Sequence, residues 1–450
     1  MANLPADLNP RICTPLPGRW APAWVLAFVA LWPLPGIAEA VLGLAALFAL
    51  ARLLQLRMRG AIGTTLGVPA WALTSVLFCA YWLPQLLSAL DAQDQWRTLG
   101  KVAGGLRYLP FMWLVAMAVA SDARRRTTFT GLAVIAGLWV LDALLQALSA
   151  TSPLFWSLDQ LKQLLSGHAL CLPQDMIGAG RINGVFGACN PKLGQVLASL
   201  SPFLLLAVGR RWGRFGWAVA AVLAGIAILL AGSRASWITY ALVLLFSGWR
   251  LLGARWMLLA MLAAVLGVAA LGVGSTQVRE RITATLPALS GKADGIDTAL
   301  AGRGRIWNGA LCMVREHPLN GVGVRGFRDA WPGCDPARGH VAEWGDGPAL
   351  HAHQLVLEIL SETGLLGLLL WLMGAAMAWR AWRYADAAAR ERARPAALAL
   401  LVTVFPFNTH LAFHSAFWGS VLLLLAALYA GALTVTHSSN KKCCDRPAGA

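Results

Sequence analysis

The chain consists mainly of long apolar runs separated by short polar connections that are rich in arginine. Each run is continuously apolar rather than alternating, and a transmembrane helix needs roughly 20 such residues. Helices are the spanning form that satisfies the backbone of such runs inside lipid. The pattern predicts an all-α polytopic membrane protein of twelve transmembrane helices, at about residues 20–36, 37–56, 68–89, 104–121, 128–149, 191–209, 214–232, 235–250, 256–274, 354–380, 395–412 and 416–436.

Two polar segments interrupt this pattern, at about residues 150–190 and 275–350. Long connections of this kind are usually functional or disordered. The second has tryptophans and a phenylalanine among its glycines and charges, so we expect a folded lid on the outer face. The predicted organisation is a helical region (1–274, with the 150–190 loop), the loop domain (275–350), the last three helices (351–436) and a tail (437–450).

Composition supports the membrane assignment. Hydrophobic residues make up 58% of the chain and charged residues 13%, against about 45–50% and 25% in soluble domains. The 21 tryptophans fit aromatic belts at the headgroup level. The net charge of +16 would suit a nucleic-acid partner only if the basic residues formed one exposed face. They lie mostly in short loops, so we expect membrane lipids and no nucleic acid.

The distribution of Lys and Arg predicts the orientation, because short cytoplasmic loops are enriched in both. With the N-terminus inside, every short inside loop is basic, for example around Arg57, Arg124, Arg211 and Arg392. Both termini are therefore predicted to be cytoplasmic, and the two long loops periplasmic. The first apolar run has no convincing cleavage site and is interpreted as an uncleaved first span.

The cysteines lack the spacing of a zinc site. Four of the eight fall in the two outer loops, on the oxidising side, as Cys171 with Cys189 and Cys312 with Cys334. A disulfide within either pair is compatible with that location. Sequence alone leaves the alternative of free thiols open, since it does not fix the distance between the Cα atoms.

Arginines at the outer rim are the first candidates for chemistry. Arg234 follows an apolar run and opens the next predicted span, and Arg181 lies in a glycine-rich segment at the end of the first outer loop. An arginine at this depth can simply snorkel to headgroup phosphate. The alternative is an anion clamp, because a guanidinium presents a planar fork that matches phosphate oxygens.

Histidines provide the candidate for acid–base work. His351 and His353 precede the tenth predicted span. If both were helical, their rings would point in different directions, which argues against a shared metal. A histidine at the first turn of a helix stays neutral, as a general base must, although a capping or packing role is more common. His410 and His414 could face the same cavity, but a third ligand is missing nearby, so we predict no metal and no cofactor.

The ensemble resembles the O-antigen ligase family, within the ligase/polymerase superfamily of bacterial envelope glycosyltransferases. The segments that carry the resemblance are Ser233-Arg234-Ala235, Arg305-Ile306-Trp307, His317-Pro318-Leu319-Asn320-Gly321-Val322-Gly323 with Phe327, His353-Gln354 with Leu357-Glu358, and Glu362-Thr363-Gly364-Leu365-Leu366-Gly367. Gln354 departs from the family pattern, where Asn is more usual.

The resemblance implies a GT-C-like enzyme in the bacterial inner membrane with its active site on the periplasmic side. It would transfer O-antigen from undecaprenyl diphosphate to lipid A–core oligosaccharide, with inversion and without metal. The same resemblance implies His353 as general base. Arg305 and Arg234, with Arg181 as a third, would bind the diphosphate.

Other functions stay open at this stage. An O-antigen polymerase or a protein O-oligosaccharyltransferase shares the same motifs. A transporter of lipid-linked glycans should carry charges through several spans, whereas here Asp142, Glu358 and Glu362 are the exceptions in apolar runs. A purely structural membrane protein is the remaining reading. The sequence gives neither the sugars nor the oligomeric state.

Overall fold

The computed structural model describes residues 18–60, 66–177, 180–274, 276–283, 302–340, 344, 347–406, 408 and 412–434. The regular elements within these ranges are helices. The predicted tail (437–450), part of the predicted 275–350 loop and His410 lie outside the described residues.

Seven helices among the described residues are long and apolar enough to cross a membrane. They are α2 (Pro35–Met58), α3 (Val68–Ser88), α6 (Asp122–Ser149), α8 (Leu193–Leu230), α9 (Arg234–Gly274, of which 234–259 qualifies), α14 (Leu355–Tyr384) and α16 (Ala416–Leu433). Three shorter helices coincide with further predicted spans: α1 (Ala21–Ala30), α5 (Tyr108–Met117) and α15 (Ala387–Thr403). All twelve predicted segments thus fall on helices, and the count of twelve crossings stays a prediction.

Two of the long helices are hairpins of consecutive predicted spans. α8 reverses at Gly213 (φ 64°, ψ −155°) and α9 at Gly253 (φ 75°, ψ 168°), conformations that favour glycine. A methyl group on Gly209 would lie 3.5 Å from Cβ of Trp217, eight residues further on. A straight helix would separate them by about 12 Å, so the chain folds back at Gly213.

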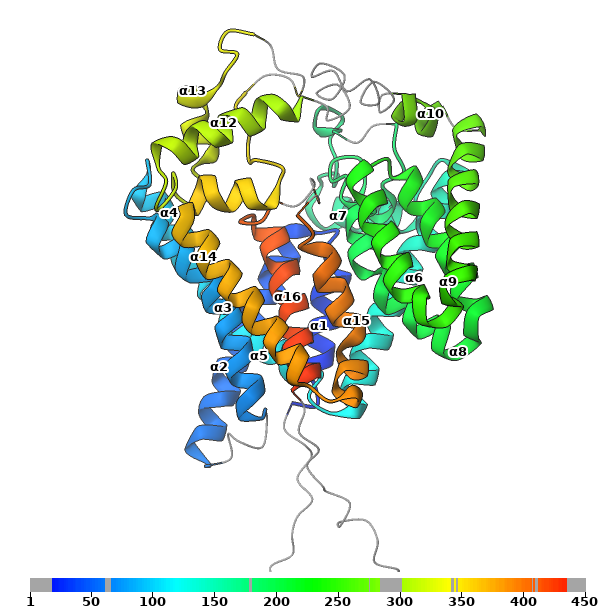
Figure 1. The fold of residues 1–450 in the computed structure, drawn as a ribbon, viewed down its shortest axis with the longest axis horizontal. Coiled ribbons are helices and arrows are strands. Elements are labelled where there is room, and N and C mark those ends of the chain that lie inside the picture. Colours follow the sequence, from blue (N-terminus) through cyan, green and yellow to red (C-terminus); the bar gives the residue numbers. More distant parts are fainter. Residues whose placement is uncertain are drawn as a thin grey trace, which may run out of the picture.

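α16 is the central helix of the bundle. Within its apolar window 89% of the residues are buried, against 22% for α9, and Figure 1 shows α16 surrounded while α9 lies at the right-hand edge. Gly431 of α16 packs against the backbone of Ala116 at the end of α5. A helix that is apolar all round, like α16, is stable only when neighbours enclose it.

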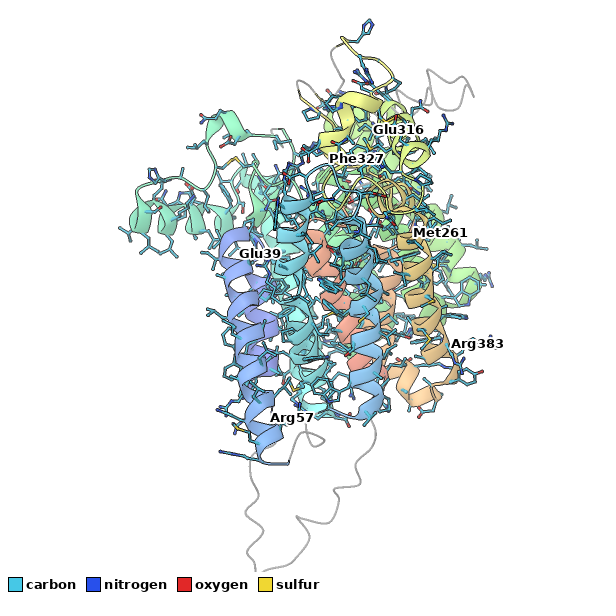
Figure 2. All side chains as sticks on the ribbon, turned by 90° about the vertical axis from the view of Figure 1, so that its left-hand side faces the viewer. Glu39, Arg57, Met261, Glu316, Phe327 and Arg383 are labelled. Carbon is cyan, nitrogen blue, oxygen red and sulfur yellow. A yellow bond between two sulfur atoms is a disulfide. The ribbon has the colours of Figure 1, made fainter. Side chains whose placement is uncertain are left out.

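Two opposite faces are defined by the ends of the helices. Figure 2 places Arg57 and Arg383 at the lower end of the bundle, and Glu316 and Phe327 above its upper end. The last turn of α16 lies beside the end of α5, so the described chain finishes on the lower face. The arginine-rich short loops and the long outer loop are therefore on opposite faces, as the charge pattern predicted.

The upper face carries four short helices: α4 (Gln95–Gly105), α7 (Pro153–Ser166), α12 (Arg303–Glu316) and α13 (Phe327–Cys334). A fifth, α10 (Thr276–Thr283), continues beyond α9. Asp142, one of the charges within an apolar run, accepts hydrogen bonds from Ser152 Oγ (2.8 Å) and the Leu154 amide (2.9 Å). Its carboxylate therefore ties α6 to the start of α7.

α14 is bent where it meets the outer loop. Gly364 (φ 67°, ψ −169°) divides it into a buried upper part and a longer lower part, and Figure 1 shows the two parts pointing in different directions. The amides of Val322 and Gly323 donate to the carbonyls of Ser361 (2.9 Å) and Glu362 (3.1 Å). Beyond the bend, the amide of Leu365 donates to the carbonyl of Pro318 (2.9 Å). The 318–323 segment is thus built into the bend.

Candidate active site

Three arginines from separate segments gather on the upper face. Ile182 N–H donates to the carbonyl of Leu230 (3.3 Å), and a methyl group on Gly232 would lie 3.6 Å from Cδ of Arg181. Arg181 therefore lies against the turn that leads into Arg234, the first residue of α9. Burial, together with the positive charge of Arg234, lowers the pKa of Arg303 in α12. A group whose pKa is shifted by burial and by a neighbouring like charge is a candidate for a functional site.

Arg305 forms its hydrogen bonds with other residues of the outer loop. Its Nε and Nη2 donate to the two carboxylate oxygens of Asp335 (2.8 and 2.7 Å), and Nη2 also donates to the carbonyls of Ala337 (2.8 Å) and His340 (3.2 Å). The guanidinium lies 5.6 Å from the ring centroid of Trp344. The hydrogen-bonded pair raises the pKa of Arg305 and lowers that of Asp335. Arg305 stabilises the outer loop in this arrangement.

The structure therefore shows Arg305 bonded to Asp335, and its expected role in binding the diphosphate stays a prediction. Arg303 and Arg305 are two residues apart, which places them about 200° apart around the helix. The charge of Arg234 acts on the pKa of Arg303, while Arg305 bonds to Asp335. Sequence reasoning passed over Arg303, and the signal available was its position in the same Gly302-Arg303-Gly304-Arg305 segment.

His353 lies beside the face of α12 that carries Arg303. Trp307 Nε1–H donates to the carbonyl of Ala352 (3.1 Å), and Trp307 is four residues after Arg303 on the same helix face. His353 has φ +52° and precedes the N-cap of α14 instead of standing in its first turn. Gln354 is that cap: its Oε1 accepts from the Leu357 amide (2.6 Å), and its Nε2 donates to the carbonyl of Pro406 (3.3 Å).

The rings of His351 and His353 lie together, with centroids 3.9 Å apart. The expectation that they point in different directions held only if both were helical, and both lie before the N-cap of α14. The left-handed backbone of His353 turns the chain just before the helix begins. His353 thus has a neighbouring imidazole that the sequence spacing did not indicate.

Glu358 and Glu362 form a buried cluster with His414. Glu362 Oε2 lies 2.8 Å from His414 Nδ1 and accepts from the Arg325 amide (3.0 Å). Glu358 Oε1 accepts from the His414 amide (3.2 Å). Both glutamates are 0% exposed and His414 is 7% exposed. His414 therefore pairs with α14, and the glutamates hold the start of α13 and the 412–415 turn in place.

Two groups of possible metal ligands occur among the described residues. One is Cys312, Glu316 and Cys334, and the other is Glu358, Glu362 and His414. The sulfurs of the first are joined in a disulfide, and most of the second is engaged in hydrogen bonds with the protein. The predicted absence of a catalytic metal stays a prediction.

Both disulfides that were compatible with the sequence are formed. Cys171 is bonded to Cys189, and Cys312 to Cys334, each with Cα atoms 5.6 Å apart. The first closes the loop that carries Arg181, and the second joins α12 to α13. Disulfides persist mainly in oxidising compartments, so the upper face has the chemistry expected of an exported face.

Lys192, at the same rim, is turned toward α16. Its Nζ donates to Asn190 Oδ1 (2.6 Å) and lies 4.7 Å from the ring centroid of Phe417. Burial lowers the pKa of Lys192. It is thus placed between the arginine-bearing loop and the central helix.

The comparison with known families covers the part of the chain that holds most of this site. Residues 219–372 match the O-antigen ligase family. The match confirms the resemblance and supports membership of the O-antigen ligase/polymerase superfamily, whose members are membrane glycosyltransferase-like enzymes. No curated protein matches the chain.

The segment that matches O-antigen ligase includes Arg234, Arg303 and His353, together with the bend of α14. Arg181 lies outside it and reaches the site through the loop closed by Cys171 and Cys189. The arginine cluster is therefore built from the O-antigen ligase segment and from one loop that precedes it.

Proposed function

We propose that this protein is an O-antigen ligase that transfers a glycan from undecaprenyl diphosphate to lipid A–core oligosaccharide. The observation that carries the proposal is the meeting of Arg181, Arg234 and Arg303 beside His353, largely within the segment that matches O-antigen ligase. The two disulfides on the same face support a periplasmic site in the inner membrane.

In this proposal the arginines bind the leaving group. As the bond between the anomeric carbon and the diphosphate oxygen breaks, its electron pair passes to the diphosphate. Guanidinium groups fixed around those oxygens stabilise the developing charge, which preorganised donors do effectively where water is partly excluded. Arg234 and Arg303 carry this role, with Arg181 as the third member. Arg305 stabilises the loop through Asp335.

His353 is proposed as the general base. The acceptor hydroxyl attacks the anomeric carbon from the side opposite the diphosphate, which inverts that centre. Its proton passes to a ring nitrogen of His353 as the new bond forms, a transfer that typically contributes about 10²–10⁴ in rate. No metal ion takes part in this proposed step, because arginines neutralise the diphosphate.

A polymerase of O-units and a protein O-oligosaccharyltransferase are the remaining enzymatic candidates. A lipopolysaccharide gel from a strain that lacks this protein separates them. We expect all O-antigen-bearing bands to disappear while lipid-linked polymer accumulates. Core with a single O-unit would show a polymerase instead, and unchanged lipopolysaccharide with an unglycosylated protein would show a protein glycosyltransferase.

A transporter is less well supported. The glutamates within α14 bond to His414 and to the Arg325 amide, and Asp142 bonds to the start of α7. These acidic groups are therefore used in packing, and they do not form a path of charges along the bundle.

A further inference from the structure

An apolar pocket of about 450 Å³ extends into the bundle from its lower part. α14 packs along α3 and only lightly against α16, and Figure 1 shows α14 crossing α16 obliquely. The pocket lies in the resulting gap, lined by α3, α14, α15 and α16 and by Phe246 of α9. Phe246, Trp379 and Leu401 of this lining are 47%, 61% and 55% exposed. The pocket therefore opens sideways, toward the surrounding lipid.

The two ends of the pocket differ. Arg394 lines it near the start of α15, and Val404 lines it about 15 Å further along the axis of that helix. This depth is about half of the roughly 30 Å hydrocarbon core of a bilayer. At the far end, the buried Tyr81 and Phe413 line the pocket, and the Tyr81 hydroxyl donates to the carbonyl of Phe413 (3.2 Å). The pocket thus has the depth of one leaflet, with its charged end at the lower face.

Three arginines from three helices surround Glu391 at this lower end. The nitrogen–oxygen distances to its carboxylate are 3.3 Å from Arg210 of α8, 3.6 Å from Arg250 of α9 and 3.8 Å from Arg394 of α15. We call these four residues the Glu391 cluster. Arg394 also donates to the carbonyl of Phe246 (3.3 Å), and both residues line the pocket. The cluster and the pocket are therefore parts of one site.

The Glu391 cluster has a surplus of positive charge. One carboxylate faces three guanidiniums, so two positive charges are not compensated within the cluster. Asp386, at the start of the same helix, caps α15 by accepting from the Ala389 amide (2.6 Å) and lines a different pocket. The Arg250 side chain is 73% exposed, which leaves the cluster accessible from the lower face. Basic pockets between helices at the cytoplasmic side are typical binding sites for anionic lipid headgroups.

Aromatic side chains line the lower part of the same pocket. Trp382 lies near the end of α14 and Tyr429 near the end of α16, with their ring centroids 6.4 Å apart. The Tyr429 hydroxyl donates to the carbonyl of Ala378 (2.7 Å). Tryptophan and tyrosine are enriched where a membrane protein meets the headgroups. The lower part of the pocket therefore has the side chains expected at the depth where a lipid headgroup begins.

We propose that the pocket and the Glu391 cluster together bind one anionic phospholipid from the leaflet of the lower face. Arg210, Arg250 and Arg394 bind the headgroup phosphate, because guanidiniums recognise phosphate oxygens through charge-assisted hydrogen bonds. An acyl chain of the same lipid fills the pocket. The lipid joins the α8 and α9 hairpins to α14, α15 and α16. This site lies on the face opposite the candidate active site, and it does not depend on the reaction proposed above.

Native mass spectrometry of the full-length protein in detergent tests the headgroup site. The protein is titrated with phosphatidylglycerol and with phosphatidylcholine of the same acyl chains. We expect phosphatidylglycerol to bind more tightly, and Arg250→Gln and Arg210→Gln each to lower its affinity about fivefold. Arg255→Gln removes an exposed arginine from the same turn of α9 and should change the affinity by less than about twofold. Glu391→Gln should raise the affinity, because it removes the carboxylate that competes with phosphate.

Two tryptophan variants of α14 test the acyl-chain site. Ala375 and Ala376 are both exposed, but Ala375 lines the pocket and Ala376 does not. Ala375→Trp should fill the pocket and lower the affinity for phosphatidylglycerol about fivefold or more, because each methylene group that it displaces loses its burial. Ala376→Trp should change the affinity by less than about twofold. Glycerophosphoglycerol, which is the headgroup without acyl chains, should not displace the lipid.

The proposal is wrong if the two phospholipids bind equally, if Arg255→Gln loses as much affinity as Arg250→Gln, or if the two tryptophan variants behave alike. A loss of affinity in Glu391→Gln would show that the cluster serves only to hold the helices together. Displacement by undecaprenyl phosphate as strong as by phosphatidylglycerol would assign the pocket to a polyprenyl chain and would also refute the site. Thermal unfolding of each variant shows whether it is folded, and Arg250→Lys, which keeps the charge, should retain most of the affinity.

Discussion

At the scale of single residues, two neighbouring arginines of α12 have different partners. Arg305 is bonded to Asp335 and to two carbonyls, whereas burial and the charge of Arg234 lower the pKa of Arg303. A guanidinium with its donors already occupied adds little to anion binding. The two residues are therefore expected to affect different properties of the protein.

Replacing Arg303 or Arg234 by Ala should abolish glycan transfer and leave expression and thermal stability near normal. Lys should restore part of the activity, because a point charge lacks the bidentate fork. The measurement is transfer in reconstituted membranes alongside a thermal unfolding curve. If Arg303→Ala transfers glycan as fast as the wild type, Arg303 does not bind the diphosphate.

Arg305→Met and Asp335→Leu should each lower stability by about 1.5–3 kcal/mol, the range for hydrogen bonds to charged groups, and the double variant should lose less than the sum. The pKa of Asp335 is lowered in the folded protein. Its contribution is therefore complete above the unfolded pKa and is lost as pH falls through the folded pKa. Unfolding curves at descending pH check this. If the stability of Asp335→Leu falls with pH as steeply as that of the wild type, the predicted contribution of Asp335 is wrong.

His353→Ala should remove transfer while donor binding persists, since the arginines are untouched. Donor binding and transfer are measured separately on the same preparation. His351→Ala is the matched control, and its inactivation alongside a fully active His353→Ala would reassign the base.

At the scale of elements, the bend of α14 and the 318–323 segment fit together through glycines. A methyl group on Gly321 would meet the backbone of Glu362 and Thr363, and one on Gly364 would meet the carbonyl of Leu319. These contacts are with backbone, which cannot rotate away as a side chain can. The two glycine motifs quoted for the family resemblance therefore have one structural cause.

Gly321→Ala should prevent stable folding of the outer loop. Gly167 is the matched control, since its φ of +72° equals the +69° of Gly321 within a few degrees, and nothing lies within 4 Å of its added methyl group. Gly167→Ala should therefore show only the left-handed strain of about 1–2 kcal/mol. Protein yield and unfolding temperature distinguish them. If Gly321→Ala and Gly167→Ala have the same yield and unfolding temperature, the backbone around Gly321 accommodates the added methyl group and the prediction is wrong.

Part of the site could be predicted from the sequence, and the limits have physical reasons. The long, uninterrupted apolar runs located the helices, because a helix that crosses a lipid bilayer needs such a run. The positions of Arg234 and Arg181 followed from the ends of those runs. The choice between Arg303 and Arg305 depended on which face of α12 packs against α13 and α14, and a single sequence does not show this. The partnership of His414 with Glu362 required the fold, because 52 residues separate them.

At the scale of the whole molecule, the two faces of the bundle differ in chemistry. Arginine-rich turns mark the lower face, and disulfides and the outer loop mark the upper face. This asymmetry predicts the orientation in the membrane. It also places the proposed active site at the leaflet of the upper face.

Cysteine labelling in intact cells checks the orientation. In a background with Cys13, Cys79, Cys443 and Cys444 changed to Ser, Leu319→Cys should react with an impermeant maleimide, because it is 59% exposed on the upper face. Met58→Cys, 80% exposed near Arg57, should react only after the cells are opened. Labelling of Met58→Cys in intact cells would invert the topology and remove the periplasmic assignment.

The close fit of the Gly321 segment into the bend of α14 determines which parts of the chain can be exchanged between related enzymes. A transplant that ends at residue 350, the predicted end of the outer loop, would divide the Gly321 segment from the turn of α14 into which it fits. A block running from residue 302 to 366 keeps both surfaces, the Cys312–Cys334 bond and the cap at Gln354 in one piece. The exchangeable module of this protein therefore combines the outer loop with the upper part of α14.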